Sequence, residues 1–263
     1  MNKNHINKNN IKLHKDYILV FIIVLLLTLI IAKKHYLNLQ LDGFTNKTPQ
    51  VINIKKSEYP IITVVCGVHG NEYAPPIGCE EFIKENNFKK GNLFFLPRIN
   101  EEGLKMKNRY LPSKSNFIFK YDINRQFGKD NNELINTITN IVDKSDFVID
   151  FHKAYRFYVS EKNFLNKSMG STISASLNDY SINIANYLVN DINKTITNPD
   201  KKFAYLDDKS YDIPYTLRDY CNKKNINYNL VEITGINDAQ PLDIRVTQTK
   251  RILTALFKHL GSL

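Results

Sequence analysis

Short apolar runs rich in β-branched residues alternate along most of this chain with segments whose apolar residues recur at helical spacing. The runs predict strands over residues 51–54, 61–66, 92–96, 147–151 and 228–233. Helical spacing predicts helices that start near Pro76 and that include residues 134–142, 185–192 and 252–260. This alternation predicts an α/β fold, a single domain with a central mixed, largely parallel β-sheet flanked by helices. In such folds functional groups gather at the carboxyl ends of the strands.

The most apolar segment of the chain lies near its N-terminus. Residues 17–32 read YILVFIIVLLLTLIIA and are flanked by lysines on both sides. As a helix this segment covers about 24 Å, and the flanking lysines can make up the difference from a hydrocarbon core of about 30 Å. We therefore expect an N-terminal transmembrane helix. The expected organisation is a basic tail, the anchor, a linker and a folded domain, at residues 1–16, 17–34, 35–50 and 51–263.

Two other interpretations of the apolar segment stay open. A cleaved signal peptide has a similar basic start and apolar middle, but the small-x-small cleavage pattern is missing because Ile30 and Ile31 precede Ala32. A buried helix is the other interpretation. Lysines are nearly balanced between the two ends, so the positive-inside rule does not set the orientation. The expected location is a membrane, reached by a single-pass N-terminal anchor, and secretion after signal cleavage is the alternative.

The charge of the chain argues against a nucleic-acid partner. The net charge is +10, but the first 50 residues hold seven lysines against two aspartates and so contribute half of it. In the remainder, basic and acidic residues are interspersed and form no basic stripe. Three cysteines are too few to form the framework of a disulfide-stapled domain.

Two predicted strands run into residues that can bind a metal. His69 and Glu72 follow the strand ITVVC in the turn GVHGNE, and His152 ends the strand that contains Asp150. Because carboxyl ends of parallel strands meet at one edge of a sheet, these side chains are expected to converge. Two histidines and one glutamate form a ligand set of catalytic zinc sites, which keep a fourth position for water. The sequence therefore predicts one zinc ion held by His69, Glu72 and His152.

The residues for catalysis and substrate binding come from three other segments. Glu232 follows the apolar strand YNLV and precedes Gly235, and burial there would raise its pKa toward that of a useful general base. Asn124 and Arg125 can bind the carboxylate of an anionic substrate, since a guanidinium group holds a carboxylate through two hydrogen bonds. Arg109 can polarise the scissile carbonyl and stabilise its oxyanion.

With these elements in order, the sequence resembles the zinc carboxypeptidase superfamily, most closely its succinylglutamate desuccinylase and aspartoacylase branch. The matching segments are GVHGNE, PRINEEG, DINRQF, DFH and VEITG, and the resemblance covers roughly residues 60–260. It implies a central mixed sheet with helices on both faces and a single zinc ion on the three predicted ligands. It also implies that Glu232 is the base and later proton donor, that Arg109 stabilises the oxyanion, and that Asn124 and Arg125 bind the free substrate carboxylate.

The resemblance also bears on a tyrosine and on the substrate. Carboxypeptidases have a mobile tyrosine upstream of the catalytic glutamate, and Tyr211 is its candidate here, with Tyr205 and Tyr215 as rivals. Aspartoacylases resemble this domain followed by a β-rich C-terminal domain, for which the short stretch after Glu232 leaves no room. A bare catalytic domain is what bacterial murein-peptide carboxypeptidases and amidases look like.

We therefore expect residues 51–263 to form a zinc hydrolase catalytic domain. The expected reaction is cleavage of an amide bond next to a carboxylate-bearing residue, by an N-acyl amino acid deacylase similar to succinylglutamate desuccinylase and aspartoacylase. One alternative is a zinc metallocarboxypeptidase that acts on peptides, including murein-type peptides. The other is a catalytically silent binding protein with the same fold. The expected substrate is a small N-acyl amino acid or a peptide with a free carboxylate.

Overall fold

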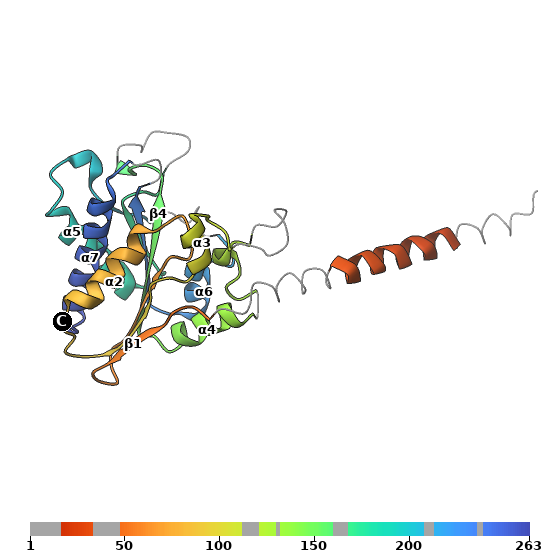
Figure 1. The fold of residues 1–263 in the computed structure, drawn as a ribbon, viewed down its shortest axis with the longest axis horizontal. Helices are drawn as coiled ribbons and strands as arrows, with labels where there is room; N and C mark the ends of the chain where they lie inside the picture. The colour runs from red at the N-terminus through yellow and green to blue at the C-terminus, as the bar shows by residue number, and fades with distance from the viewer. Residues whose placement is uncertain are drawn as a thin grey trace, which may run out of the picture. The chain divides into compact units, whose positions relative to one another are not determined.

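The computed structural model of the protein describes residues 17–33, 48–111, 121–129, 132–159, 168–207, 213–235 and 239–263. The chain divides into two units, Met1–Phe44 and Thr45–Leu263. Figure 1 shows the described helices and strands of each unit.

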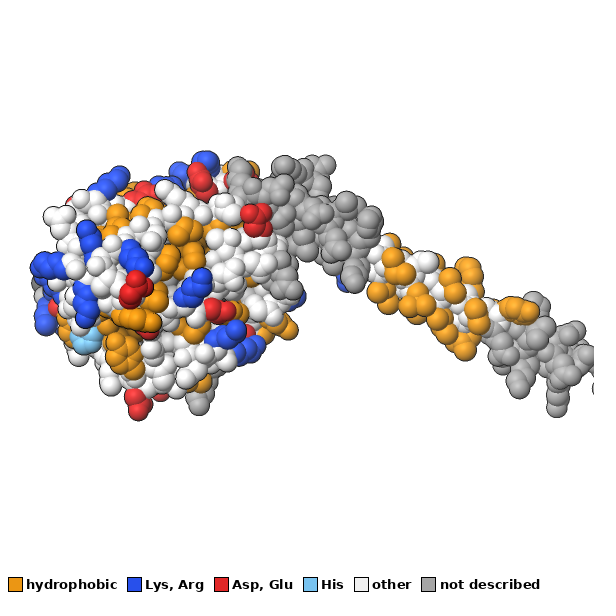
Figure 2. All heavy atoms as spheres, turned by 90° about the horizontal axis from the view of Figure 1, so that it is seen from below, with side chains coloured by type: hydrophobic (Ala, Val, Ile, Leu, Met, Phe, Trp, Pro, Cys, Tyr) orange, Lys and Arg blue, Asp and Glu red, His pale blue; other side chains and the backbone are white. Residues whose placement is uncertain are grey.

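The described part of the first unit is a helix over residues 17–33 whose side chains are exposed and almost all apolar (Figure 2). Among the described residues, no helix is long and apolar enough to cross a membrane. The predicted transmembrane anchor over residues 17–34, and the membrane as a partner, are therefore not supported. The location of the protein stays a prediction.

One mixed sheet forms the centre of the second unit, as predicted. Its strands are β1 (Ile52–Lys55), β2 (Ile61–Cys66), β3 (Asn92–Leu96), β4 (Phe147–Ala154), β5 (Thr172–Ala175), β6 (Ala204–Tyr205) and β7 (Tyr228–Thr234). Their spatial order is β1-β3-β2-β4-β7-β5-β6. The central strands β3, β2, β4 and β7 are parallel, whereas β1 is antiparallel to β3 and β5 is antiparallel to β7. The carboxyl ends of β2, β4 and β7 therefore lie at the same edge.

Helices cover both faces of this sheet. They are α2 (Ala74–Glu85), α3 (Glu101–Met106), α4 (Glu133–Val142), α5 (Asp179–Asn193), α6 (Leu217–Lys224) and α7 (Leu242–His259), with a short 3-10 helix η1 at Ile123–Arg125 and another at Pro199–Lys201. Side-chain caps define several starts: Asn132 accepts from the backbone of Ile135 at the start of α4, and Asn178 accepts from that of Ser181 at the start of α5. Helices α2, α5 and α7 lie on one side of the sheet, and α3, α4 and α6 on the other (Figure 1).

Alternation along the strands assigns each side chain to one of these faces. Phe147, Ile149 and Phe151 of β4 pack in the core beneath α2, α5 and α7. Val148, on the other face, packs with residues of α4 and α6. Because successive side chains of a strand point to opposite faces, Asp150 and His152 share the face of Val148. This face, at the carboxyl ends of the strands, positions the candidate site.

Candidate active site

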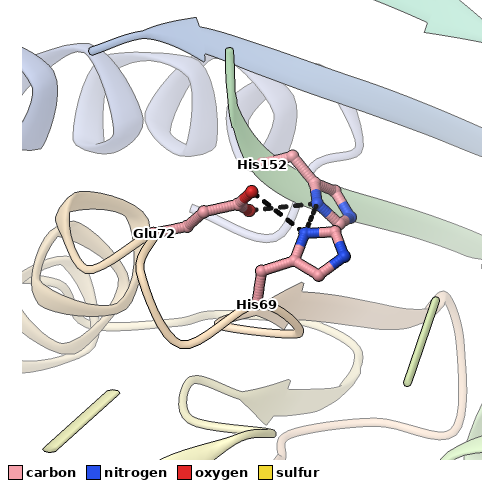
Figure 3. Close-up of side chains that lie close together, drawn as sticks. All are labelled: His69, Glu72 and His152. Carbon is pink, nitrogen blue, oxygen red and sulfur yellow. Dashed lines mark hydrogen bonds and ion pairs between the residues drawn. The ribbon is translucent and has the colours of Figure 1, made fainter. Parts of the chain in front are cut away.

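Three side chains from separate parts of the chain converge at the carboxyl ends of β2 and β4. His69 follows β2, Glu72 precedes α2, and His152 lies near the end of β4. Nδ1 of His69 lies 2.9 Å from Oε1 of Glu72 and 3.1 Å from Nδ1 of His152 (Figure 3). All three side chains are buried, and one potential ligand atom from each lies within 4.8 Å of the others. The structure thus brings together the three predicted metal ligands.

The carboxylate of Glu72 shows that this cluster fits a cation. Its Oε2 atom is buried and lies 3.1 Å from Nδ1 of His152, yet it has no hydrogen-bond partner among the described residues. Burial alone would raise the pKa of Glu72, but the neighbouring imidazoles hold it below the ordinary glutamate range. Two imidazole nitrogens and a charged carboxylate around one point are donors that zinc accepts. These residues would hold zinc and leave one ligand position open.

Asp122 orients the ring of His69. Its Oδ1 atom lies 3.1 Å from Nε2 of His69, so that the other ring nitrogen faces the remaining two ligands. Its Oδ2 atom accepts a hydrogen bond of 3.3 Å from Nη2 of Arg109. Burial alone would raise the pKa of Asp122, but His69, Arg109 and Arg125 hold it below the ordinary range. Asp122 was not among the predicted site residues, although the motif DINRQF begins with it.

Close backbone packing shapes the turn that carries His69. Gly67 has a φ of +67°, a left-handed conformation that residues with a side chain rarely adopt. A Cβ atom at Gly70 would lie 2.1 Å from the carbonyl carbon of Gly103 in α3, so α3 would have to move. The backbone N–H of Gly70 donates to the carbonyl of Arg109 over 3.2 Å. The turn is thereby fixed against the segment that carries Arg109.

Glu232 lies beside the cluster of ligands. It is on β7, where its backbone pairs in register with His152 of β4. Burial raises the pKa of Glu232 to about 7. The charge of His152 opposes this shift and that of Glu72 adds to it. A carboxyl group with a pKa near neutrality is suited to general acid–base chemistry.

One cleft of about 180 Å³ contains most of the predicted site. The predicted residues that line it are His69, Glu72, Arg109, Asn124, Arg125, His152 and Glu232. Tyr211 lies outside the described residues. Its rivals Tyr205 and Tyr215 lie within the described residues, but neither is among those that line the cleft.

The two arms of the predicted substrate clamp are held in place by backbone contacts. Oδ1 of Asn124 accepts a hydrogen bond of 2.9 Å from the backbone N–H of Leu217, at the start of α6. The side-chain oxygen is thus engaged, and the NH2 group of Asn124 is the part that can donate to a carboxylate. Nη1 of Arg125 donates to the carbonyl of Asn124 over 2.6 Å. The clamp is therefore tied to α6.

Two cationic side chains that were not among the predicted site residues also line the cleft. Arg218 lies in the first turn of α6 and is 7% exposed. Lys153 follows His152, and its Nζ atom donates to the carbonyl of Asn71 over 2.6 Å. With the two predicted arginines, the described lining includes four cationic side chains and the two carboxylates of Glu72 and Glu232. No sequence motif marks Arg218, because only the packing of α6 brings it to the cleft.

Several solved structures share this fold. Csd4 of Helicobacter pylori, a D,L-carboxypeptidase, aligns with a TM-score of 0.69 at 17% identity, over 81% of this chain and 55% of its own. A candidate metallopeptidase of Shewanella denitrificans aligns with a TM-score of 0.61 at 14% identity, over 85% and 84%. Succinylglutamate desuccinylase/aspartoacylase of Rhodobacter sphaeroides aligns with a TM-score of 0.57 at 15% identity, over 82% of this chain and 59% of its own. The chain spans about half the length of Csd4, and at these identities the likeness concerns the fold.

The sequence provides a separate comparison. Residues 58–162 match the model of the succinylglutamate desuccinylase/aspartoacylase catalytic domain. The predicted resemblance to the zinc carboxypeptidase superfamily is confirmed. The matched residues contain the three candidate ligands and the substrate clamp, whereas Glu232 lies beyond them. No relative among curated protein sequences matches the chain.

Proposed function

We propose that the chain is a zinc-dependent hydrolase that cleaves an amide bond next to a carboxylate-bearing residue. The position of Glu232 carries this proposal, because a carboxyl group with a pKa of about 7 lines the same cleft as His69, Glu72 and His152. A general base beside a cation site is the arrangement that hydrolysis of an amide needs.

Each chemical task of the proposed reaction falls to a residue of the cleft. A zinc ion held by the three ligands would act as a Lewis acid on the substrate carbonyl. Glu232 takes a proton from the attacking water on its carboxylate and delivers it to the nitrogen of the leaving amine. Arg109, whose Nη1 lies 3.6 Å from Oε1 of Glu72, donates to the oxyanion as it forms. Asn124 and Arg125 bind the free carboxylate of the substrate and so orient its amide bond.

The pH dependence of the reaction is expected to report Glu232. Only the deprotonated carboxylate can accept a proton, so kcat/KM rises with pH through the pKa of Glu232 and is lost below it. Burial raises this pKa to about 7, and a nearby zinc ion lowers it again. The acidic limb of the profile is therefore expected below 7 and above the ordinary glutamate value of about 4.3. Zinc content measured across the same pH range separates this limb from loss of metal, and constant kcat/KM down to the ordinary value would contradict the assignment.

The charge of the cleft favours a substrate with more than one carboxylate. Asn124 and Arg125 account for one carboxylate, and Arg218 and Lys153 place two further cations in the same cleft. An N-acyl amino acid with an acidic side chain or an acidic acyl group meets this requirement, in keeping with the family model. The likeness of the fold to Csd4, which is known in tripeptide-bound and mDAP-bound forms, favours a peptide carboxypeptidase as the second candidate.

The two candidates differ in the product that they release. The zinc-loaded full-length chain is incubated with a pool of N-acyl amino acids and with a pool of N-blocked peptides, and free amino acids are identified by mass spectrometry. Release from the acyl pool supports the deacylase. Release from peptide C-termini supports the carboxypeptidase. A zinc-loaded chain that releases nothing from either pool would contradict both and favour the silent binding protein.

Arg218 is expected to select the second carboxylate of the substrate. A buried hydrogen bond to a charged group contributes about 1.5–3 kcal/mol, so Arg218→Met should raise KM for a dicarboxylic substrate about 10- to 100-fold. For a matched substrate with a single carboxylate the change should be small. The control is Arg251→Met, which removes a guanidinium group that pairs with Asp191 between α5 and α7. An equal loss on both substrates would show that Arg218 does not act on the second carboxylate.

A further inference from the structure

A buried tyrosine and aspartate lie behind the metal ligand His152. Asp150 has no exposed surface and Tyr228 is 1% exposed. In the parallel pairing of β4 with β7, Val148 is opposite Tyr228 and Asp150 is opposite Leu230. Because alternate residues of a strand share a face, Asp150 and Tyr228 lie on the same face of the sheet as His152.

These side chains form a chain of contacts that ends at the metal ligands. The hydroxyl of Tyr228 donates to Oδ2 of Asp150 over 3.0 Å. The same oxygen lies 3.1 Å from Nε2 of His152. The opposite ring nitrogen, Nδ1 of His152, lies 3.1 Å from Nδ1 of His69 and 3.1 Å from Oε2 of Glu72. An Nε2–H group that donates to a carboxylate leaves the lone pair of Nδ1 for a metal.

The buried carboxylate of Asp150 makes its side-chain contacts with Tyr228 and His152 through a single oxygen. A buried charge is costly unless hydrogen bonds compensate it. The Oδ1 atom of Asp150 is buried without a hydrogen-bond partner among the described residues. The contacts of the carboxylate therefore converge on Oδ2, where the hydroxyl of Tyr228 and the ring of His152 meet. Without that hydroxyl, rotation of the carboxylate would turn its proton acceptor away from His152.

We propose that Tyr228 is a positioning residue for the metal ligand His152 and acts on it through Asp150. This inference rests on the metal site of the proposed function. It assigns to the first residue of β7 a task in metal binding, although the side chain comes from a different strand than any of the three ligands. Tyr228 also lines the cleft, so a direct contact with the substrate is the competing role.

The test is the zinc affinity of the full-length chain, measured without substrate by competition with a chromophoric chelator. Tyr228→Phe keeps the ring and removes only the hydroxyl. Loss of the outer partner of a metal ligand weakens metal binding about 10- to 100-fold, and we expect about 10-fold here because Asp150 remains. The matched control is Tyr220→Phe, which removes a hydroxyl that donates to Asp143 over 2.7 Å, outside the cleft. Its zinc affinity should equal that of the wild type.

A second variant tests whether Tyr228 acts through Asp150. Asp150→Asn is expected to weaken zinc binding about 10- to 100-fold, since the amide is a poorer partner for the ring of His152. In the Asp150→Asn background, Tyr228→Phe should then have little further effect, because the carboxylate that it holds is gone. Thermal melting of the zinc-free variants checks that each one folds. If Tyr228→Phe does not fold, Asp150→Asn alone still tests whether Asp150 supports the metal ligand His152.

The outcomes separate this inference from the proposed function. Equal zinc affinity in Tyr228→Phe and the wild type, or full additivity in the double variant, would overturn the positioning role. So would a raised KM with unchanged zinc affinity, which would make Tyr228 a substrate contact. None of these results affects the hydrolase proposal. Conversely, a wild-type chain that binds zinc but hydrolyses nothing would contradict the hydrolase and leave the role of Tyr228 standing, whereas a wild type without zinc affinity would overturn both.

Discussion

Glu232→Gln is expected to lower kcat by about 10³-fold, within the range that a positioned general base contributes, while zinc stays bound. Glutamine has nearly the same size as glutamate and can still form hydrogen bonds, but it cannot accept a proton from water. Glu232 is separate from the cluster of His69, Glu72 and His152 that would hold the metal. The variant therefore removes proton transfer and leaves the metal site intact. Single-turnover rates and zinc content, measured on the same sample, check both parts of this expectation.

An exposed glutamate provides the control for this variant. Glu58 forms an ion pair with Lys55 over 2.6 Å at the surface, so Glu58→Gln should change neither kcat nor zinc content. The expected size of the effect also distinguishes the possible roles of Glu232. If Glu232 only bound substrate, its substitution would raise KM and leave kcat nearly unchanged. Full activity of Glu232→Gln with zinc bound would exclude Glu232 as the base.

The central strands could be predicted because each contains a short apolar run rich in β-branched or aromatic residues. The predicted strands at residues 61–66 and 92–96 coincide with β2 and β3. β4 continues to Ala154, past its apolar run, because its parallel pairing with β7 continues through that residue. β5 was missed, since its sequence TISA is short and half hydroxyl-bearing. It is a strand because it pairs antiparallel with β7, and such a long-range contact leaves no local signal.

The difference between local sequence signals and long-range contacts also explains which site residues could be predicted. His69, Glu72 and His152 follow apolar strands, so the sheet topology alone brings them to one edge. Arg218 and Tyr228 have no such marker. Arg218 reaches the cleft through the packing of α6, and Tyr228 reaches Asp150 from a neighbouring strand. Sequence patterns therefore locate the residues that lie at strand ends, and tertiary packing decides which side chains surround them.

His69→Ala is expected to abolish stoichiometric zinc binding and to lower kcat/KM by about 10³-fold or more, because a bound metal contributes several kcal/mol to the reaction. The substitution removes one of three ligand side chains and leaves Glu72 with one imidazole fewer to balance its buried charge. His259→Ala is the matched control, since His259 is exposed on α7 and its ring packs on Tyr187. Zinc content and initial rates are measured for both variants, before and after treatment with a chelator.

Reconstitution separates loss of metal from loss of fold. Chelator-treated wild type and His259→Ala should regain activity when zinc is added, whereas His69→Ala should not. Zinc that binds only the folded state stabilises it, so zinc-free wild type is the correct reference for the stability of His69→Ala. His69→Ala should melt below zinc-free wild type, because Glu72 keeps its buried charge with one imidazole fewer, but in one cooperative transition, because the core beneath α2, α5 and α7 does not include His69. Undiminished activity of the chelated wild type would mean that the reaction needs no metal, and the cluster of His69, Glu72 and His152 would then require another explanation.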